Sequence, residues 1–277
     1  IRYSALWRGL VVMSDNVLRI FSYLPNPRVW KALIAADYLG VSVEVLGDKP
    51  KNLGNWLWDF DARELEEEEK TEDSPHARVS RRGFSGALYK TDAFMRTQPY
   101  GTVPAAFSAN GEVGVFESNS ILRAVARSAP DDNGLYGFTP LEASRIDSFL
   151  DATLVFGREA QVYLLGIDGI SQELHARMAG AFEFYLDGIE RALEHSTCIA
   201  GDQVTLADIA FACDVSQFLR ERLMGAGLEA ASLPMISENA ETTFPCAFAH
   251  LSTLIEAPVF KRYLGEYTEH FRVSPLT

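Results

Sequence analysis

The chain has 277 residues, of which 47% are hydrophobic and 23% charged, and its net charge at pH 7 is −13. These values are typical of a soluble globular protein of two ordinary domains, and no apolar run approaches membrane-spanning length. The acidic balance argues against direct binding of nucleic acid, which needs a basic face. Only three cysteines occur, without CxxC spacing, so the sequence indicates neither a disulfide framework nor a zinc cluster. A reducing, cytoplasmic location fits this cysteine usage best.

The first part of the chain alternates between strand and helix patterns. We expect residues 1–16 to form an N-terminal arm. Val17 to Ser22 alternates as a strand, residues 28–38 have helical spacing that ends at Gly40, and Val41 to Val45 alternates again. This order predicts two parallel strands joined by a right-handed helical crossover.

Between about residues 48 and 92 the regular patterns disappear. Trp56 and Trp58 predict a segment that docks on the rest of the protein, whereas Glu64 to Glu69 and Arg78 to Arg82 form acidic and basic blocks. We interpret this stretch as an insertion with a mobile, solvated middle. A segment that binds a partner or is phosphorylated is the alternative.

Residues 100–127 predict a β-hairpin followed by a helix, after a short helix over Thr91 to Arg96. Ser118 stands where it would cap the new helix, beside the turn at Val103-Pro104. A helix start next to an outward-turned backbone edge could bind an anionic, peptide-like ligand, most readily if the X-Pro bond is cis. An ordinary hairpin with an ordinary helix cap is the alternative.

The second half of the chain predicts a linker over residues 130–139 and an all-helical domain over residues 140–277. Thr205 and Asp208 form the pattern of a capping box, in which each residue satisfies donors at the start of a helix. This pair is interpreted as structural. Cys213 lies on the apolar face of the same helix and is expected to be a core thiol. Helices are predicted over residues 141–162, 171–195, 205–224, 241–255 and 259–267.

Several motifs resemble those of the glutathione transferase superfamily, namely GTVPA, FESNSI and IAGDQVTLADIAF. Longer stretches are similar to the transferase-like N-terminal domain of translation elongation factor 1B gamma: KALIAADYLGVSVEVL, VFESNSILRAVAR, LYGFTPLEASRIDSFLD and PVFKRYLGE. The resemblance implies an α/β thioredoxin-like domain over residues 17–129, with the insertion inside it, followed by the all-α domain.

The resemblance also implies a glutathione site. The residue matching Val103 would pair its backbone with the cysteinyl part of glutathione, and the proline matching Pro104 would be cis. The pair matching Glu117 and Ser118 would hold the γ-glutamyl end.

The residue that would activate the thiol is less well defined. Asn26 aligns best by position, with Ser22 and Tyr23 as alternatives. An asparagine there could donate a hydrogen bond to a thiolate, or it could be an Asx-turn residue that starts the helix.

Two functions follow from the resemblance. The first is a scaffold that binds protein partners, such as subunits of the translation elongation factor complex. The second is an enzyme that conjugates or reduces electrophiles with glutathione as co-substrate, without a tightly bound cofactor or metal. A homodimer is expected from the superfamily alone.

Overall fold

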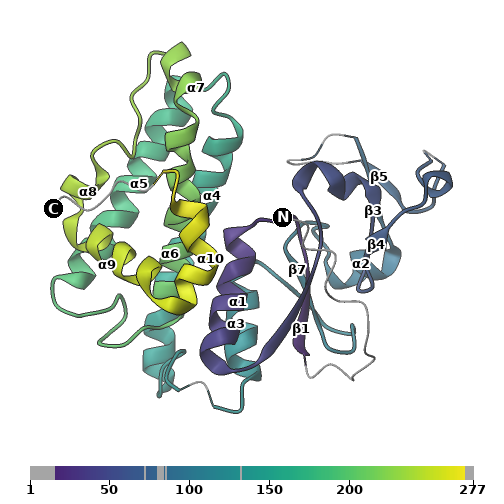
Figure 1. The fold of residues 1–277 in the computed structure, drawn as a ribbon, viewed down its shortest axis with the longest axis horizontal. Coiled ribbons are helices and arrows are strands. Elements are labelled where there is room, and N and C mark those ends of the chain that lie inside the picture. Colours follow the sequence, from purple (N-terminus) through teal and green to yellow (C-terminus); the bar gives the residue numbers. More distant parts are fainter. Residues whose placement is uncertain (1–15, 72, 80–83, 85, 132, 272–277) are drawn as a thin grey trace.

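The structure is a computed structural model that describes residues 16–71, 73–79, 84, 86–131 and 133–271. The predicted N-terminal arm lies outside the described residues except for Asn16. Figure 1 shows a half built on β-sheets and a helical half side by side, with α1 and α3 between the first sheet and the helices. No helix in the described part of the chain is long and apolar enough to cross a membrane.

The first sheet has the strand order β2-β1-β7-β8, in which β1 and β2 are parallel and the other neighbours are antiparallel. The strand, helix, strand unit and the hairpin predicted from the sequence are therefore confirmed. The elements of this unit are β1 (Asn16–Phe21), α1 (Pro27–Leu39), β2 (Ser42–Leu46), β7 (Ala105–Ser108), β8 (Gly114–Phe116) and α3 (Ser118–Ser128).

Local chemistry explains where α1 begins and ends. Pro27 occupies the first turn, where its missing N–H costs nothing, and the Asn26 side chain accepts a hydrogen bond from the backbone N–H of Arg28. Gly40 ends the helix at φ 64°, a left-handed conformation that glycine adopts without steric cost.

The predicted insertion contains a second sheet, so the expectation that regular structure disappears there was wrong for its described residues. The docking predicted for its aromatic start is confirmed, because Trp58 is buried in the second core. The strand order is β4-β3-β6-β5, with β3 and β6 parallel. Its strands have two to four residues each, too few for an alternating pattern to stand out. The elements are a 3₁₀ turn (Pro50–Asn55), β3 (Trp56–Trp58), β4 (Arg63–Glu64), a 3₁₀ turn (Glu67–Glu69), β5 (Ala77–Val79), β6 (Ala87–Lys90) and α2 (Asp92–Thr97).

The two sheets share a core of their own. On β1, Leu18 and Ile20 face the large core that also contains α1 and α3, whereas Phe21 faces the second core with Trp58. Trp58 is 1% exposed, and its ring meets Phe21 edge-on at a centroid distance of 5.4 Å. The second core therefore fixes the insertion to the free face of the first sheet. Its buried members are Phe21, Leu53, Trp58, Ala62, Leu88, Phe94, Ala105 and Phe107.

We predict that Trp58→Ala lowers the free energy of unfolding by about 3–5 kcal/mol, because it opens a cavity among packed aromatic rings. The substitution also removes the hydrogen bond of 3.0 Å that the Trp58 indole N–H donates to the carbonyl of Leu53. Urea denaturation measures the loss. The control is Phe184→Ala, whose side chain is 82% exposed and should change little. Equal stability of the two variants would contradict a shared core.

The helical half is organised around α6, which is buried at every position except Gln217. Helices α1, α4 and α9 pack against it. The all-α prediction is confirmed, although two predicted helices are interrupted. The helix predicted over 205–224 becomes 3₁₀ after Phe218, and that over 241–255 is broken before Pro245. The helices are α4 (Pro140–Leu165), α5 (Gln172–Leu193), α6 (Leu206–Phe218), a 3₁₀ turn (Leu219–Leu223), α7 (Gly225–Ala230), α8 (Ala240–Thr243), α9 (Pro245–Glu256) and α10 (Pro258–Thr268).

Candidate functional site

The residues predicted to activate a thiol lie between β1 and α1, where Asn26 has a structural role. It is fully buried, its Oδ1 accepts from the backbone N–H of Arg28 at 3.0 Å, and its Nδ2 donates to Ser22 Oγ at 3.1 Å. Both ends of the amide are thus used inside the protein, as in an Asx-type helix start. A catalytic role for Asn26 or for the equally buried Ser22 stays a prediction.

Tyr23 has a different environment. Burial raises the pKa of its hydroxyl, and the positive charges of Arg28 and Arg220 oppose that rise to a smaller extent. The phenol therefore keeps its proton at neutral pH. It can donate a hydrogen bond to an anion, which is the property required to stabilise a thiolate.

The Val103-Pro104 bond is cis, as the resemblance implies. Pro104 is buried, and Val103 packs against the second core. At the start of α3, Glu117 is exposed and has φ 66° and ψ 125°, a conformation that non-glycine residues seldom adopt. Such backbone conformations are found most often at ligand sites. The geometry of Val103, Pro104 and Glu117 is compatible with a bound peptide-like anion.

Ser118 is not the helix cap that the sequence predicted. Glu117 occupies the cap position of α3, and Ser118 is the first helical residue, buried with 7% exposure. Its hydroxyl accepts a hydrogen bond of 3.2 Å from the ammonium of Lys31. The side chain is therefore committed to an interior polar network, because Lys31 extends from α1 to the start of α3.

Lys31 is the centre of that network. It is 1% exposed, and its ammonium also donates to Asn119 Oδ1 at 2.8 Å and to Asp214 Oδ2 at 2.5 Å. Asp214 lies on α6 and is 3% exposed. The ammonium thus has three acceptors and one full countercharge, which satisfies a cation that would otherwise be very costly to bury.

Further bonds extend the network across the two halves of the molecule. Asn119 donates to the carbonyl of Leu150 on α4 at 2.6 Å, and the Arg28 guanidinium donates to the carbonyl of Gly157 at 2.6 Å. A Cβ atom at Gly157 would lie 3.3 Å from Asp214, so the small residue allows this close approach. Helices α1, α3, α4 and α6 are joined by polar bonds in the middle of an apolar interface.

Sequence analysis missed Lys31 and Asp214, although a signal was present. Lys31 is the one charged residue on the buried face of its helix, Asp214 is one of two aspartates in a helix that is otherwise mostly apolar, and the two charges are opposite. Charged residues are almost never fully buried unless they are paired. Two such isolated charges of opposite sign are therefore candidates for an ion pair.

We predict that Lys31→Met lowers the free energy of unfolding by about 3–5 kcal/mol, because it leaves the Asp214 carboxylate buried without its main partner. Adding Asp214→Asn to this variant should restore part of the loss. Denaturant unfolding of both variants at neutral pH checks the expectation. The two residues are not coupled if Asp214→Asn lowers the free energy of unfolding of the Lys31→Met variant as much as it lowers that of the unaltered chain.

The comparisons with solved structures agree with this architecture. A glutathione transferase of Phanerochaete chrysosporium, solved with oxidized glutathione, superposes with a TM-score of 0.63 over 95% of this chain and 100% of its own, at 15% identity. A glutathione transferase of Methylobacillus flagellatus with glutathione bound has a TM-score of 0.59 over 89% of this chain and 98% of its own, at 12% identity. The chain has the glutathione transferase fold.

The sequence comparisons are more specific. No family model matches the chain. Elongation factor 1-gamma 2 of Oryza sativa is 27% identical over 91% of this chain and 49% of its own length. Elongation factor 1-gamma of Mus musculus is 26% identical over 89% of this chain and 46% of its own. The chain is therefore similar in sequence to the elongation factor 1-gamma proteins, and it spans about half of their length.

The capping box of this glutathione transferase fold is confirmed and is more extensive than predicted. The Asp208 carboxylate is fully buried and accepts from the backbone N–H and hydroxyl of Thr205, at 2.8 and 3.0 Å. It also accepts from the backbone N–H of Ile199 at 3.0 Å and bonds to His250 Nε2 at 2.8 Å. Cys213, on the same helix, is fully buried, and burial raises the pKa of its thiol far above the ordinary value.

We predict that Asp208→Ala lowers the free energy of unfolding by about 3 kcal/mol or more, because several buried donors lose their acceptor at once. Thr205→Ala, which removes one side of the box, should cost only about 1 kcal/mol. Thermal and urea unfolding measure both losses. A stable Asp208→Ala variant that has lost only a ligand-binding function would reverse the structural assignment.

A pocket of about 200 Å³ opens beside the second sheet. None of the residues predicted to contact glutathione lines it. Its lining combines two carboxylates, two amides and one ammonium, and the indole N–H of Trp56 is buried there without a hydrogen-bond partner. The lining residues are Asp48, Asn52, Asn55, Trp56, Glu64, Leu65 and Lys70.

Proposed function

We propose that the chain is an interaction module of the elongation factor 1-gamma type, in which a glutathione transferase fold binds protein partners of the translation elongation machinery. The observation that carries this proposal is the similarity to plant and animal elongation factors 1-gamma over about nine-tenths of the chain. Such a role places the protein in the cytoplasm. Its net charge of −13 supports partners that are proteins rather than bare nucleic acid.

The site geometry supports the scaffold. Ser22 and Asn26 are bonded to each other inside the protein, and the Ser118 hydroxyl is held by Lys31. Three of the polar groups that a glutathione site would use are therefore already engaged in stabilising the fold. Their arrangement can be kept for stability alone, without a catalytic reaction.

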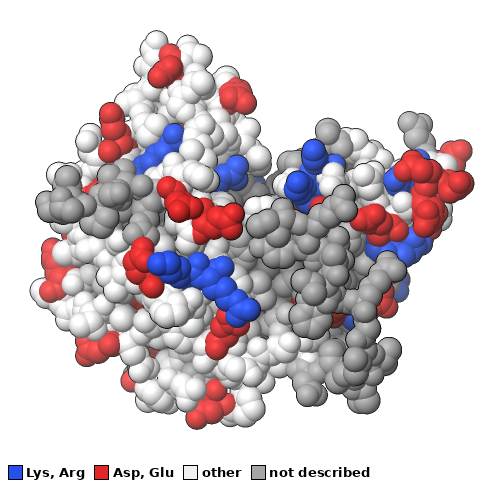
Figure 2. Space-filling model, viewed as in Figure 1, with Lys and Arg blue, Asp and Glu red and all other residues white. Residues whose placement is uncertain are grey.

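The partner surface we propose is the acidic tip of the second sheet. Figure 2 shows acidic side chains gathered there, where the segment from Glu64 to Glu69 lies. A 3₁₀ turn and the ion pairs Arg63–Glu69 and Lys70–Glu67 order this segment. Trp58 lies in the core and does not contribute to this surface. The tip suits a basic partner.

Association with purified elongation factor subunits, measured by co-elution, tests the proposal. We expect Glu67→Lys combined with Glu68→Lys to weaken association at least tenfold, because the charge complementarity is reversed. The matched control is Glu173→Lys with Glu183→Lys, two exposed acidic residues of α5, which gives the same change in net charge. If the unaltered chain associates with none of the subunits, the scaffold proposal is wrong.

Glutathione binding is the second candidate function, and the backbone conformation of Glu117 at the start of α3 favours it. Two structural neighbours were solved with glutathione bound. A glutathione transferase reaction would use Tyr23, Asn26 or Ser22 to stabilise the thiolate. A homodimer would accompany either function.

If glutathione binds, we predict that Ser118→Ala weakens binding about tenfold, a loss near 1.4 kcal/mol, because a hydroxyl that contacts the γ-glutamyl end is removed. Ser120→Ala, one half-turn further along α3, serves as the control. Calorimetric titration measures affinity, and turnover of a generic electrophile is recorded with the same samples. Tight binding that Ser118→Ala leaves unchanged would contradict this placement of the ligand.

A further inference from the structure

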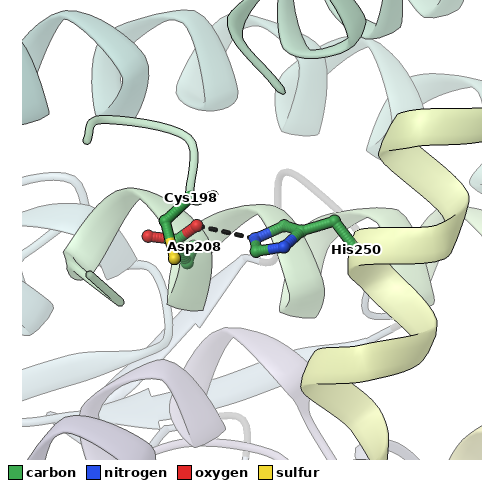
Figure 3. A group of neighbouring side chains, drawn as sticks. All are labelled: Cys198, Asp208 and His250. Atoms are coloured by element: carbon green, nitrogen blue, oxygen red, sulfur yellow. Dashed lines mark hydrogen bonds and ion pairs between the residues drawn. The ribbon is translucent and has the colours of Figure 1, made fainter. Parts of the chain in front are cut away.

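Three side chains from separate parts of the helical half converge near the start of α6. Cys198 lies in the loop between α5 and α6, Asp208 in the first turn of α6, and His250 on α9. One donor atom from each, the thiol sulfur, a carboxylate oxygen and a ring nitrogen, lies within 4.8 Å of the other two. Figure 3 shows the imidazole of His250 directed at Asp208, with the Cys198 sulfur beside the same carboxylate.

The donor set is specific in its chemistry. Sulfur, nitrogen and oxygen ligands together suit Zn²⁺, which accepts all three types in a tetrahedral site. Magnesium and calcium prefer oxygen ligands only, so a buried thiol and imidazole exclude them. Three protein ligands leave the fourth tetrahedral position for water or another small ligand.

Contacts with the surrounding protein hold the three ligands in place. The backbones of Cys198 and Gly201 are paired as an isolated bridge, which fixes the loop. Thr205 and the backbone N–H of Ile199 orient the Asp208 carboxylate. The His250 ring stacks on Phe211 at a centroid distance of 6.2 Å. Such outer contacts orient metal ligands and raise metal affinity.

We propose that Cys198, Asp208 and His250 form a Zn²⁺ site with three protein ligands and one open position. The ion takes the position between His250 Nε2 and Asp208 Oδ1, which are now 2.8 Å apart and hydrogen-bonded. Water ligands leave the hydrated ion as bonds from zinc to sulfur, nitrogen and oxygen form, and the hydrogen bond between His250 and Asp208 breaks. The thiol proton leaves to solvent, and the imidazole binds in its neutral form with the proton on Nδ1. The ion would join the α5–α6 loop, α6 and α9.

No motif in the sequence indicates this site, because its ligands come from three distant segments and share no short spacing. The spacings that identify zinc sites in a sequence come from ligands on one loop or hairpin. The present ligands meet only because α9 packs against both α5 and α6.

A titration with Zn²⁺ against a chromophoric competitor tests the proposal. It uses the 277-residue chain after treatment with a chelator. We expect one equivalent to bind and the melting temperature to rise by about 5 °C or more at a hundredfold excess over Kd. Mg²⁺ should do neither. Co²⁺ should give the near-ultraviolet charge-transfer band of a cobalt–thiolate bond.

Cys198→Ser and His250→Gln should each weaken zinc binding at least tenfold, and Cys198→Ser should remove the cobalt–thiolate band. Gln at position 250 can still donate to Asp208, so the fold is preserved, and circular dichroism checks this. Cys246→Ser and His195→Gln are the matched controls, because these residues lie outside the cluster. Asp208 is left unchanged because of its capping role.

Absence of zinc binding by the chelator-treated chain would overturn the proposal. So would binding that both controls weaken as much as the cluster variants do. Binding that survives Cys198→Ser, or a cobalt band lost only in Cys246→Ser, would place the ion elsewhere and would overturn it equally. None of these results depends on whether the chain binds a translation partner or glutathione.

Discussion

The buried ion pair between Lys31 and Asp214 is the constraint on which the arrangement of the two halves depends. It lies where α1 of the sheet half meets α6, the central helix of the helical half. An apolar interface alone would tolerate sliding of one helix along the other, because hydrophobic contact is not directional. A buried charge pair with additional bonds to Ser118 and Asn119 defines one register, since any other leaves charges uncompensated.

This constraint also links stability to the candidate ligand site. The hydroxyl of Ser118 is an acceptor for the same ammonium that neutralises Asp214. Whatever binds at the start of α3 therefore meets a helix end whose position is set from within the protein. In a scaffold, this fixed helix start makes the fold rigid. In a thiol-binding site, it would hold the binding groups in position before the ligand arrives.

Elements with long, regular patterns could be predicted from the sequence, and short ones could not. The helix ending at Gly40 and the capping box at Thr205 and Asp208 carry local signals strong enough to determine their structure. The strands of the second sheet are too short to show a period, and their stability comes from Trp58 and Phe94 in a core formed by distant residues. Ser118 was misassigned as a cap because a positive φ at Glu117 leaves no trace in a residue pattern.

The glutathione transferase fold was recognised from motifs, whereas the interior bonds that occupy its polar groups needed coordinates. From the sequence, Asn26 could be either a donor to a thiolate or an Asx-turn residue, and its hydrogen bond to Ser22 can be seen only once β1 and α1 are placed. Which partner each polar atom selects is decided by packing, which acts between positions far apart in the chain.

The second core changes how the insertion relates to the rest of the protein. Because Phe21, Ala105 and Phe107 of the first sheet share it with Leu53 and Leu88 of the insertion, neither layer can separate without exposing apolar surface of the other. In evolutionary terms, such a segment cannot be lost or shortened stepwise like a surface loop. Removing it would require a new cover for the exposed face of the thioredoxin-like sheet.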